Sequence, residues 1–237
     1  MARCRGVAVG NNIAMTFTGI PAEAFDFYDG LMADNSKAFW ADHKQEYESF
    51  VAQPMRELAA VLEPTFGTGH LYRPYRDVRF SKDKTPYKDH QGLFVESRNG
   101  LGWYVQINRT GLMAAGGWYM STSEQVARFR EAVAEDEGGL LQSLLDAAVA
   151  AGLTIGGQRL KTRPRGIDPD HPRLDLLRHR SLHVSRSWEP AAWMGTAGAA
   201  QVIGRAWESM RPAMDWLADA VGPGEAPVGS ARGRRSR

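Results

Sequence analysis

The chain has 237 residues, which is long enough to bury a sizeable core in one large domain or two small ones. Apolar residues at 43% and charged residues at 24% are close to the average of soluble globular proteins, which argues against wholesale disorder. No apolar run approaches the roughly 20 residues of a membrane-spanning helix, and the single cysteine, Cys4, excludes an intrachain disulfide, so we expect a cytoplasmic protein.

The positive charge of the chain is concentrated at its two ends. The whole chain carries +2, whereas residues 1–14 alone contribute +2 and the arginine-rich residues 223–237 contribute +3, so that residues 15–222 carry −3. An acidic body argues against a large nucleic-acid surface, which needs a basic face, although the tail leaves such a partner open. We predict a single domain over residues 15–222, between a disordered extension at 1–14 and a disordered Arg-rich tail at 223–237.

The first part of the body has the periodicity of helices. Apolar residues recur at helical spacing over residues 21–34 and predict a first helix. A second helix is expected to begin at Lys37, behind the capping residue Ser36, and to end before the glycines of residues 67–69. Pro54 lacks a backbone donor, so we expect it to kink this helix or to start a new one.

Strand signals follow in the middle of the chain. The alternation of residues 76–80 predicts a short strand, and residues 81–88 a loop. Three strands joined by tight turns are expected at residues 92–97, 101–108 and 112–120. Asn99-Gly100 is a strong hairpin signal between the first two, and Gly116-Gly117 predicts a bulge in the third. One face of the second of these strands is apolar, at Trp103, Val105 and Ile107.

The last part returns to helices. Ser121 and Glu124 predict a capping box at the start of a helix, and further helices are expected over residues 140–150 and 174–178. A strand is expected at 182–185, before a final helix that Pro212 should bend. That helix, 197–221, has a stripe of core residues at Ile203, Trp207, Met210, Met214, Leu217 and Val221. Together these elements predict an α+β fold, a single domain in which an antiparallel β-meander sheet packs against several helices.

The stretch from Tyr72 to Lys88 is the most distinctive part of the sequence, because it mixes cations with tyrosines. Its six cations are Arg73, Arg76, Arg79, Lys82, Lys84 and Lys88. Arginine offers a rigid fork of donors and lysine a mobile point charge, and both bind phosphate and carboxylate. The stretch therefore favours binding of an anionic small molecule.

A second basic cluster, which includes Arg163 and Arg165, follows the helices in the last part of the chain. If that cluster and Arg186 meet the loop at 81–88, one cleft would be lined by several cations. Flat walls for a ring would come from Trp103, Tyr104, Trp118 and Tyr119. The candidate ligand-binding residues are Arg76, Asp77, Arg79, Ser81, Lys82, Asp83, Lys84, Tyr87, Lys88, Arg163, Arg165 and Arg186.

Two other functions stay open. Asp77 and Asp83 beside lysines suit a metal-dependent nucleic-acid-processing enzyme, provided that the two carboxylates converge. Alternatively, Asp77 pairs with an arginine as a buried salt-bridge brace, and the protein is a non-catalytic interaction module. The phosphate-loop, dinucleotide, hydrolase-elbow and zinc-protease motifs are absent from the sequence. We assign no catalytic residue, cofactor or oligomeric state. We also assign no metal site, since His179 and His183, which are four residues apart, straddle a predicted helix end and would not share a helix face.

The run from Tyr75 to Lys88 resembles the signature of an uncharacterised family, domain of unknown function 2461. The similarity continues in residues 25–40, in 116–120, in 160–172 and in 183–186, and so covers almost the whole body. It implies a compact bacterial α+β protein that starts near Met15, without a known reaction, cofactor or catalytic residue. The chain departs from the family at His183, where an aromatic residue is usual, and in its Arg-rich tail.

Overall fold

A six-stranded antiparallel sheet organises the computed structural model, which describes residues 16–135 and 137–224. The strands are β1 (Gly69–Leu71), β2 (His90–Glu96), β3 (Leu101–Asn108), β4 (Gly111–Trp118), β5 (Thr154–Gly156) and β6 (Leu182–Trp188). Their order is β1-β2-β3-β4-β6-β5, so β2, β3 and β4 form the predicted meander, β1 adds an edge strand that was not predicted, and β6 lies between β4 and the other edge strand, β5. The predicted extension at 1–14 and the predicted tail beyond Gly224 lie outside the described residues.

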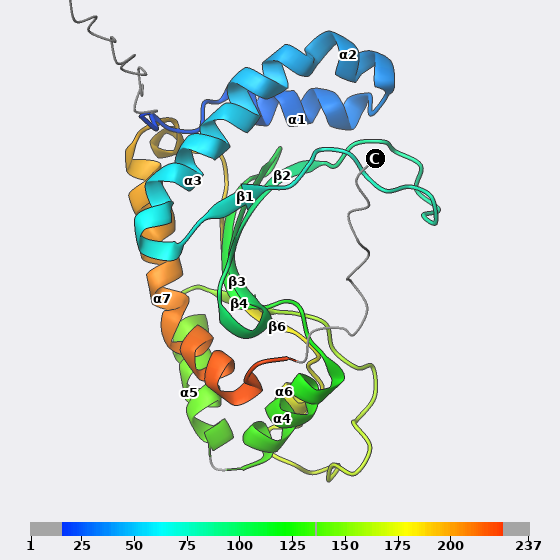
Figure 1. Ribbon diagram of the computed structural model, residues 1–237, viewed down its shortest axis with the longest axis vertical. Helices are drawn as coiled ribbons and strands as arrows, with labels where there is room; N and C mark the ends of the chain where they lie inside the picture. Colours follow the sequence, from blue (N-terminus) through cyan, green and yellow to red (C-terminus); the bar gives the residue numbers. More distant parts are fainter. Residues whose placement is uncertain (1–15, 136, 225–237) are drawn as a thin grey trace, which may run out of the picture.

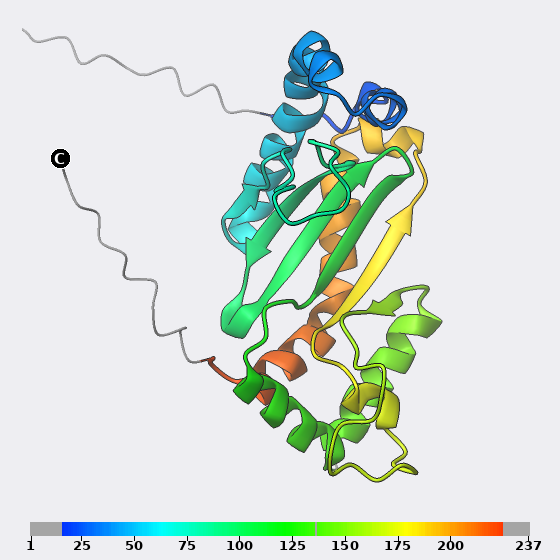
Figure 2. The same cartoon turned by 90° about the vertical axis from the view of Figure 1, so that its right-hand side faces the viewer.

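Helices pack on one face of this sheet and at its two ends. They are α1 (Glu23–Ala33), α2 (Lys37–Glu46), α3 (Gln53–Phe66), α4 (Ser123–Ala134), α5 (Glu137–Ala150), α6 (Leu174–Leu177) and α7 (Gly198–Val221). Figure 1 shows α3 and α7 along one face, α1 and α2 beyond one end of the strands, and α4 and α6 beyond the other. The opposite face of β2, β3 and β4 curves away from α3 and α7, and we call it the open face (Figure 2). The predicted α+β fold with a single domain is confirmed.

The core lies between the sheet and α7. All six residues of the predicted stripe on α7 are buried, and the indole rings of Trp207 and Trp103 stack with their centres 5.8 Å apart. The edge of Phe66, at the end of α3, meets the Trp207 ring at 4.9 Å. The predicted hairpin at Asn99-Gly100 is also confirmed: both residues have positive φ (61° and 81°), which Asn and Gly adopt most readily.

The long helical segment of the first half continues past Pro54. Ser36 caps α2 as predicted, since its hydroxyl accepts a hydrogen bond from the amide of Phe39 at 3.1 Å. A π-helical stretch, Tyr47–Ala52, joins α2 to α3 and precedes Pro54, which occupies the first turn of α3. The backbone N–H groups of a first helical turn have no partner within the helix, so proline loses no hydrogen bond there. Pro54 therefore starts a new helix, and the helical segment continues through it.

Three of the predictions about local structure are wrong. Residues 76–80 form no strand, because no neighbouring strand pairs with them, and Phe80 is 96% exposed. The residue that caps α4 is Thr122, with Gln125 as its partner, rather than Ser121 with Glu124. Strand β4 has no bulge at Gly116-Gly117, where pairing with β3 is continuous.

Among the helices of the described residues, none has both the length and the apolar character needed to cross a membrane.

Gln91 joins the helical layer to the sheet and to the chain that leaves β1. The side chain is almost completely buried, and its amide oxygen accepts a hydrogen bond from the hydroxyl of Tyr47 at 2.6 Å. Its amide nitrogen donates to the carbonyl oxygens of Tyr72 at 2.8 Å and Gly92 at 2.9 Å. One side chain therefore satisfies three buried polar groups from three parts of the chain.

We expect Gln91→Leu to lower the free energy of unfolding by about 2–4 kcal/mol. A leucine of similar size leaves the Tyr47 hydroxyl and the Tyr72 carbonyl without partners, and each such buried group costs about 1–3 kcal/mol. Denaturant unfolding measures this difference, with Gln45→Leu on the exposed side of α2 as the control. The control should change stability by less than about 0.5 kcal/mol. Equal effects of the two substitutions would contradict the role given to Gln91.

Candidate functional site

A chain of aromatic rings covers the open face of the sheet. Phe94 on β2 lies directly opposite Tyr104 on β3, and both side chains point away from α3 and α7. The ring of Tyr72 lies 6.4 Å from both of them, and the edge of Tyr119 lies 5.9 Å from Phe94. His183 on β6 extends the chain, because its ring stacks on Tyr119 at 5.5 Å with the planes 19° apart.

Glycines between these rings allow them to lie against the sheet. A Cβ at Gly92 would stand 2.5 Å from the Tyr104 hydroxyl oxygen, and one at Gly102 would stand 2.2 Å from the Phe94 ring. A Cβ at Gly117 would stand 2.4 Å from the Cβ of His183. All three distances are far below ordinary contact. Gly92 and Gly102 therefore provide room for aromatic rings, and Gly117, one of the two glycines that suggested a bulge, allows the close approach of β6.

The rings enclose a cavity of about 200 Å³, which we call the aromatic cavity. Its lining consists of Tyr72, Phe94, Tyr104, Tyr119 and Met120. The hydroxyl of Tyr104 donates to the side-chain oxygen of Gln106 at 2.9 Å. The hydroxyl of Tyr119 is buried and has no hydrogen-bond partner among the described residues. Burial raises the pKa of both phenols, so both are protonated at neutral pH.

Lys88 stands where the basic stretch meets the aromatic cavity. Its ammonium nitrogen lies 5.1 Å from the centre of the Tyr72 ring, within the range of a cation–π interaction. Burial lowers the pKa of this ammonium, and the nearby charge of Arg73 lowers it further. Lys88 therefore stands over a ring that lines the cavity, within electrostatic reach of Arg73.

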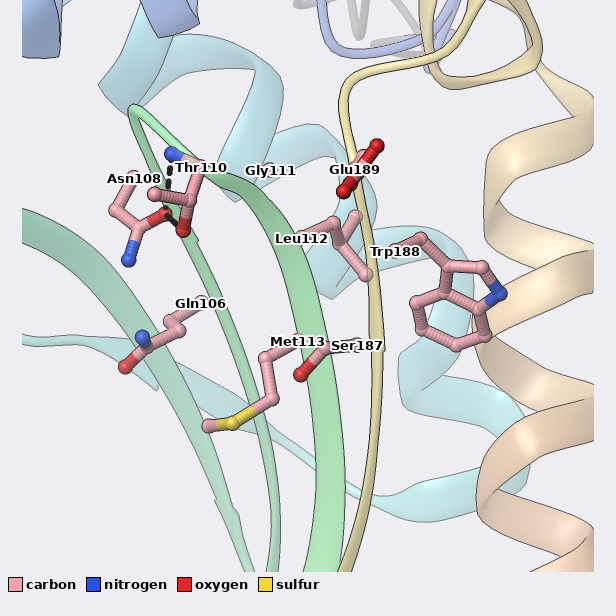
Figure 3. A pocket seen from close by; sticks show the side chains of 9 residues that line it. All are labelled: Gln106, Asn108, Thr110, Gly111, Leu112, Met113, Ser187, Trp188 and Glu189. Atoms are coloured by element: carbon pink, nitrogen blue, oxygen red, sulfur yellow. Dashed lines mark hydrogen bonds between the residues drawn. The ribbon is translucent and has the colours of Figure 1, made fainter. Parts of the chain in front are cut away.

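A second cavity, of about 340 Å³, lies beside the first on the open face, and we call it the polar cavity. Gln106 lines it together with Asn108, Thr110, Gly111, Leu112, Met113, Ser187, Trp188 and Glu189. Figure 3 shows Gln106, Met113 and Ser187 on one side of the strands and the ring of Trp188 directed toward the helices. Tyr104 lines the aromatic cavity and Gln106 lines the polar cavity, so the hydrogen bond between these two side chains joins the linings of the two cavities.

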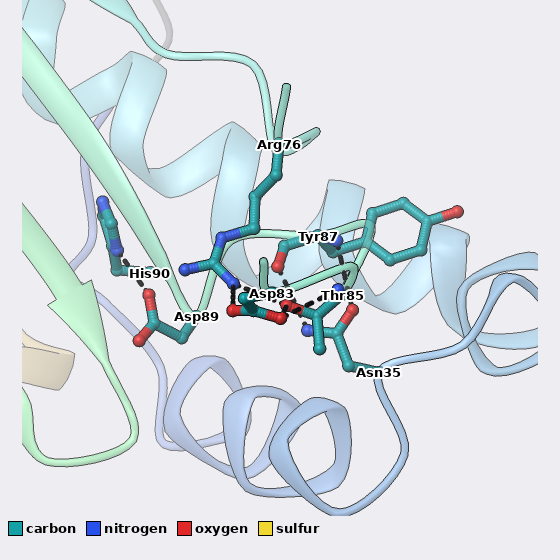
Figure 4. A network of polar contacts seen from close by, with 7 residues as sticks. All are labelled: Asn35, Arg76, Asp83, Thr85, Tyr87, Asp89 and His90. Atoms are coloured by element: carbon teal, nitrogen blue, oxygen red, sulfur yellow. Dashed lines mark hydrogen bonds and ion pairs between the residues drawn. The ribbon is translucent and has the colours of Figure 1, made fainter. Parts of the chain in front are cut away.

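Two anchors fix the base of the loop that carries the cations. The side chain of Asn35 bonds both the amide and the carbonyl of Tyr87, each at 3.1 Å (Figure 4). The ring of Tyr87 stacks on Trp40 of α2 at 4.3 Å, with planes 9° apart. Tyr75 pairs with Tyr87 in an isolated β-bridge, so the two arms of the loop are also held together. Tyr87 is consequently buried and acts as an anchor in this structure.

Three of the six cations are already bound within the loop. Arg76 donates to the carboxylate of Asp83 and to Thr85, next to the Asn35 anchor (Figure 4). Lys84 donates to the carbonyl of Val78 at 2.9 Å. The third pair lies near the exposed end of the loop.

Arg79 binds both carboxylate oxygens of Asp77, at 2.9 and 2.7 Å, yet its side chain is 76% exposed. Hydrogen bonds from Arg79 hold the pKa of Asp77 below its usual value, and those from Thr85 do the same for Asp83. These exposed pairs are not the buried brace considered from the sequence.

The other cations of the stretch are Arg73, Lys82 and Lys88. None of them makes a side-chain hydrogen bond or an ion pair with another described residue. Lys82 and Ser81 are exposed in the outer part of the loop. Lys88 and Arg73 are thus the unpaired cations that lie near one another and near the aromatic cavity.

The structure does not bring the second basic cluster to this loop. The segment that carries Arg163 and Arg165 is tied to the end of α6, where Arg178 donates to the carbonyls of Leu160 and Lys161. Figures 1 and 2 show α6 and this segment at the opposite end of the sheet from the loop.

The single cleft that would unite all the cations is therefore a wrong expectation. On β6, Arg186 lies opposite Ala114 and its guanidinium stands 5.7 Å from the Trp188 ring, on the helix-covered side of the sheet.

The two aspartates do not form a metal site in this structure. Asp77 binds Arg79, whereas Asp83 binds Arg76 and Thr85. The described residues contain no group of three or more His, Cys, Asp or Glu side chains that could hold a metal ion. The carboxylates therefore give no support to a metal-dependent nucleic-acid enzyme.

Sequence reasoning found only part of the aromatic cavity. Tyr104 and Tyr119 were expected as flat walls and line the open face, but Trp103 and Trp118 are buried on the other side. Phe94 and Tyr72 were not singled out as walls. Phe94 could have been predicted as a wall, because the alternation along β2 places this aromatic residue on the face of the strand that points away from the core.

One family model matches the chain, over residues 23–216, and it is described as a conserved hypothetical protein (DUF2461). The matched range runs from the start of α1 into α7 and contains the loop, the open face and both cavities. The resemblance drawn from the sequence is confirmed. No curated protein and no solved structure matches the chain.

The anchors and the outer ion pair of the loop should differ in their effects on stability. We expect Asn35→Ala to lower the free energy of unfolding by about 1–2 kcal/mol, because two part-buried groups of Tyr87 lose their partners. We expect no measurable change for Arg79→Ala, because exposed ion pairs contribute little. Denaturant unfolding of both variants measures the difference, and a large loss for Arg79→Ala would restore the buried-brace hypothesis.

Proposed function

The chain belongs to the DUF2461 family of conserved hypothetical proteins, and we propose that it binds a small molecule with a flat ring and an acidic group. The ring occupies the aromatic cavity, and a phosphate or carboxylate binds Lys88 and Arg73 at its rim. The observation that carries the proposal is the position of the Lys88 ammonium, 5.1 Å from the ring of Tyr72. One residue, Tyr72, thus belongs to both the cavity and the cation site.

The size of the cavity supports a single ring. An apolar cavity of about 150 Å³ is known to hold a benzene molecule, so about 200 Å³ is sufficient for one six-membered ring. Aromatic walls favour a flat ligand, because offset and edge-to-face contacts each add about 0.5–1.5 kcal/mol beyond the buried area. Phe94 and Tyr119 already meet edge to face, with planes 80° apart.

The arrangement of charge supports an acidic group on the ligand. Lys88 and Arg73 are close enough for one to lower the pKa of the other, and neither is paired with a described carboxylate. An anion placed between them would relieve this repulsion. The loop keeps Arg76 and Arg79 on its own aspartates, so the acidic group has two cations to bind rather than six.

The polar cavity supplies room for further polar parts of the same molecule. It adjoins the aromatic cavity at the Tyr104–Gln106 hydrogen bond, and Ser187 and Glu189 contribute oxygen atoms to its lining. A ligand longer than one ring would extend into this space.

Phenyl phosphate and benzoate are the simplest probes of this function. We expect both to raise the melting temperature of the wild-type protein, because a ligand that binds only the folded state stabilises it. Inorganic phosphate, which lacks the ring, should have a smaller effect at the same concentration.

The substitution Lys88→Met tests the cation, since methionine keeps an apolar stem against Tyr72. We expect the Kd for phenyl phosphate, from titration calorimetry, to rise by about tenfold, or about 1.4 kcal/mol. Lys82→Met is the matched control, because Lys82 is an unpaired cation of the same loop in an exposed position. Equal losses for the two variants, or no loss for Lys88→Met, would disprove the proposed site.

A further inference from the structure

We infer that the hydroxyl of Tyr119 selects the ligand, by donating a hydrogen bond to an acceptor atom on the bound ring. The ligand class is then a heteroaromatic acid, whose ring carries a nitrogen or a carbonyl oxygen as the acceptor. This inference rests on the proposed function and adds to it the kind of ring that binds.

The hydroxyl of Tyr119 differs from those of two other phenols near this site, Tyr47 and Tyr104. Tyr47 donates to Gln91 at 2.6 Å and Tyr104 donates to Gln106 at 2.9 Å, whereas Tyr119 has no partner within the described structure. A buried hydroxyl without a partner costs stability that a phenylalanine would not. Among the side chains of residues 16–135 and 137–224, the other buried polar atoms without partners are the indole nitrogens of Trp40 and Trp118, which do not line the cavity.

The ring of Tyr119 is held in a fixed position. His183 stacks on its face at 5.5 Å, and Phe94 meets it edge to face at 5.9 Å. The backbone amides of Tyr119 and Met120 both donate to the carbonyl of Gly100 at 3.2 Å. The hydroxyl therefore stays in one place at the cavity.

The three phenols of the cavity are directed toward a common space. Tyr72 and Tyr104 lie near enough to Tyr119 for their charges to raise its pKa, in addition to the larger effect of burial. The hydroxyl of Tyr104 is already bonded to Gln106, and Tyr72 is partly exposed and can bond water. Tyr119 is consequently the buried phenol of this cavity that is left to meet a ligand.

The chemistry of a protonated phenol defines the complementary atom. A phenol donates one strong hydrogen bond, so its best partner is an acceptor such as a pyridine-type nitrogen or an exocyclic carbonyl oxygen. Because the Tyr119 hydroxyl is shielded from solvent, a ligand that lacks the acceptor leaves this hydroxyl unpaired. Sites of this kind reject the deficient analogue strongly.

The free protein gives the first test, through the melting temperatures of Tyr119→Phe and Tyr104→Phe. We expect Tyr119→Phe to leave the melting temperature unchanged or to raise it, because no hydrogen bond is lost. Tyr104→Phe should lower it, because the bond to Gln106 is lost. A fall for Tyr119→Phe as large as that for Tyr104→Phe would overturn the inference without any ligand, since the hydroxyl would then have a partner within the protein.

The second test compares benzoate with its three pyridine analogues, the 2-, 3- and 4-pyridinecarboxylates. We expect at least one pyridine isomer to bind the wild-type protein about tenfold more tightly than benzoate in titration calorimetry. In Tyr119→Phe this preference should disappear, while the Kd for benzoate stays the same.

The outcomes separate the inference from the proposed function. If benzoate binds in a Lys88-dependent way but no pyridine isomer is preferred, the role of Tyr119 is disproved and the proposed function stands. A preference that persists in Tyr119→Phe disproves the role of Tyr119 as well. If neither phenyl phosphate nor any of these acids binds, the proposed function fails, and the inference fails with it.

Discussion

The buried amide of Gln91 is the interaction on which the candidate site depends. Gln91 lies in β2, and its side chain forms hydrogen bonds with the Tyr47 hydroxyl of the helical layer and with the Tyr72 carbonyl at the start of the loop. Tyr72 is therefore fixed at its backbone, which places its ring beside Phe94 and beneath the ammonium of Lys88. Without Gln91 this part-buried carbonyl would lose its hydrogen-bond donor. The position of the Tyr72 ring thus depends on the hydrogen bonds of one buried amide.

The open face differs from that of an ordinary antiparallel sheet. When helices cover one face, the other usually carries polar residues that contact water. Here Phe94 and Tyr104 occupy outward positions, and glycines at 92 and 102 leave room for their rings. Glycine weakens a strand, and an exposed cluster of aromatic rings favours association, so neither feature helps the fold by itself. Both are accounted for if the rings form a surface for a ligand.

The sequence predicted the layers of the fold well and the site only in part. Helical periodicity located the buried stripe of α7, and the apolar face of β3 implied that Tyr104 points the other way. The alternation of apolar and polar residues also predicted a strand at 76–80 that does not form, because the sequence of this stretch cannot show that no neighbouring strand pairs with it. The cavity depends on the register of β2 with β3 and on the path of the loop, and both are set by contacts distant in sequence. For the same reason the six cations looked alike in the sequence, although three are bound within the loop.

The anchoring of the loop favours a small ligand over a polymer. Asn35 fixes Tyr87 and Gln91 fixes Tyr72, so both ends of the basic stretch are held before any ligand arrives. A cation that is already in position loses little freedom on binding, which improves affinity for a ligand that makes few contacts. A nucleic acid needs many cations free to meet successive phosphates, but Arg76 and Arg79 are occupied by Asp83 and Asp77. The aspartates of the motif thus leave Lys88 and Arg73 for the proposed anion-binding site, which is the scale of one phosphate or one carboxylate.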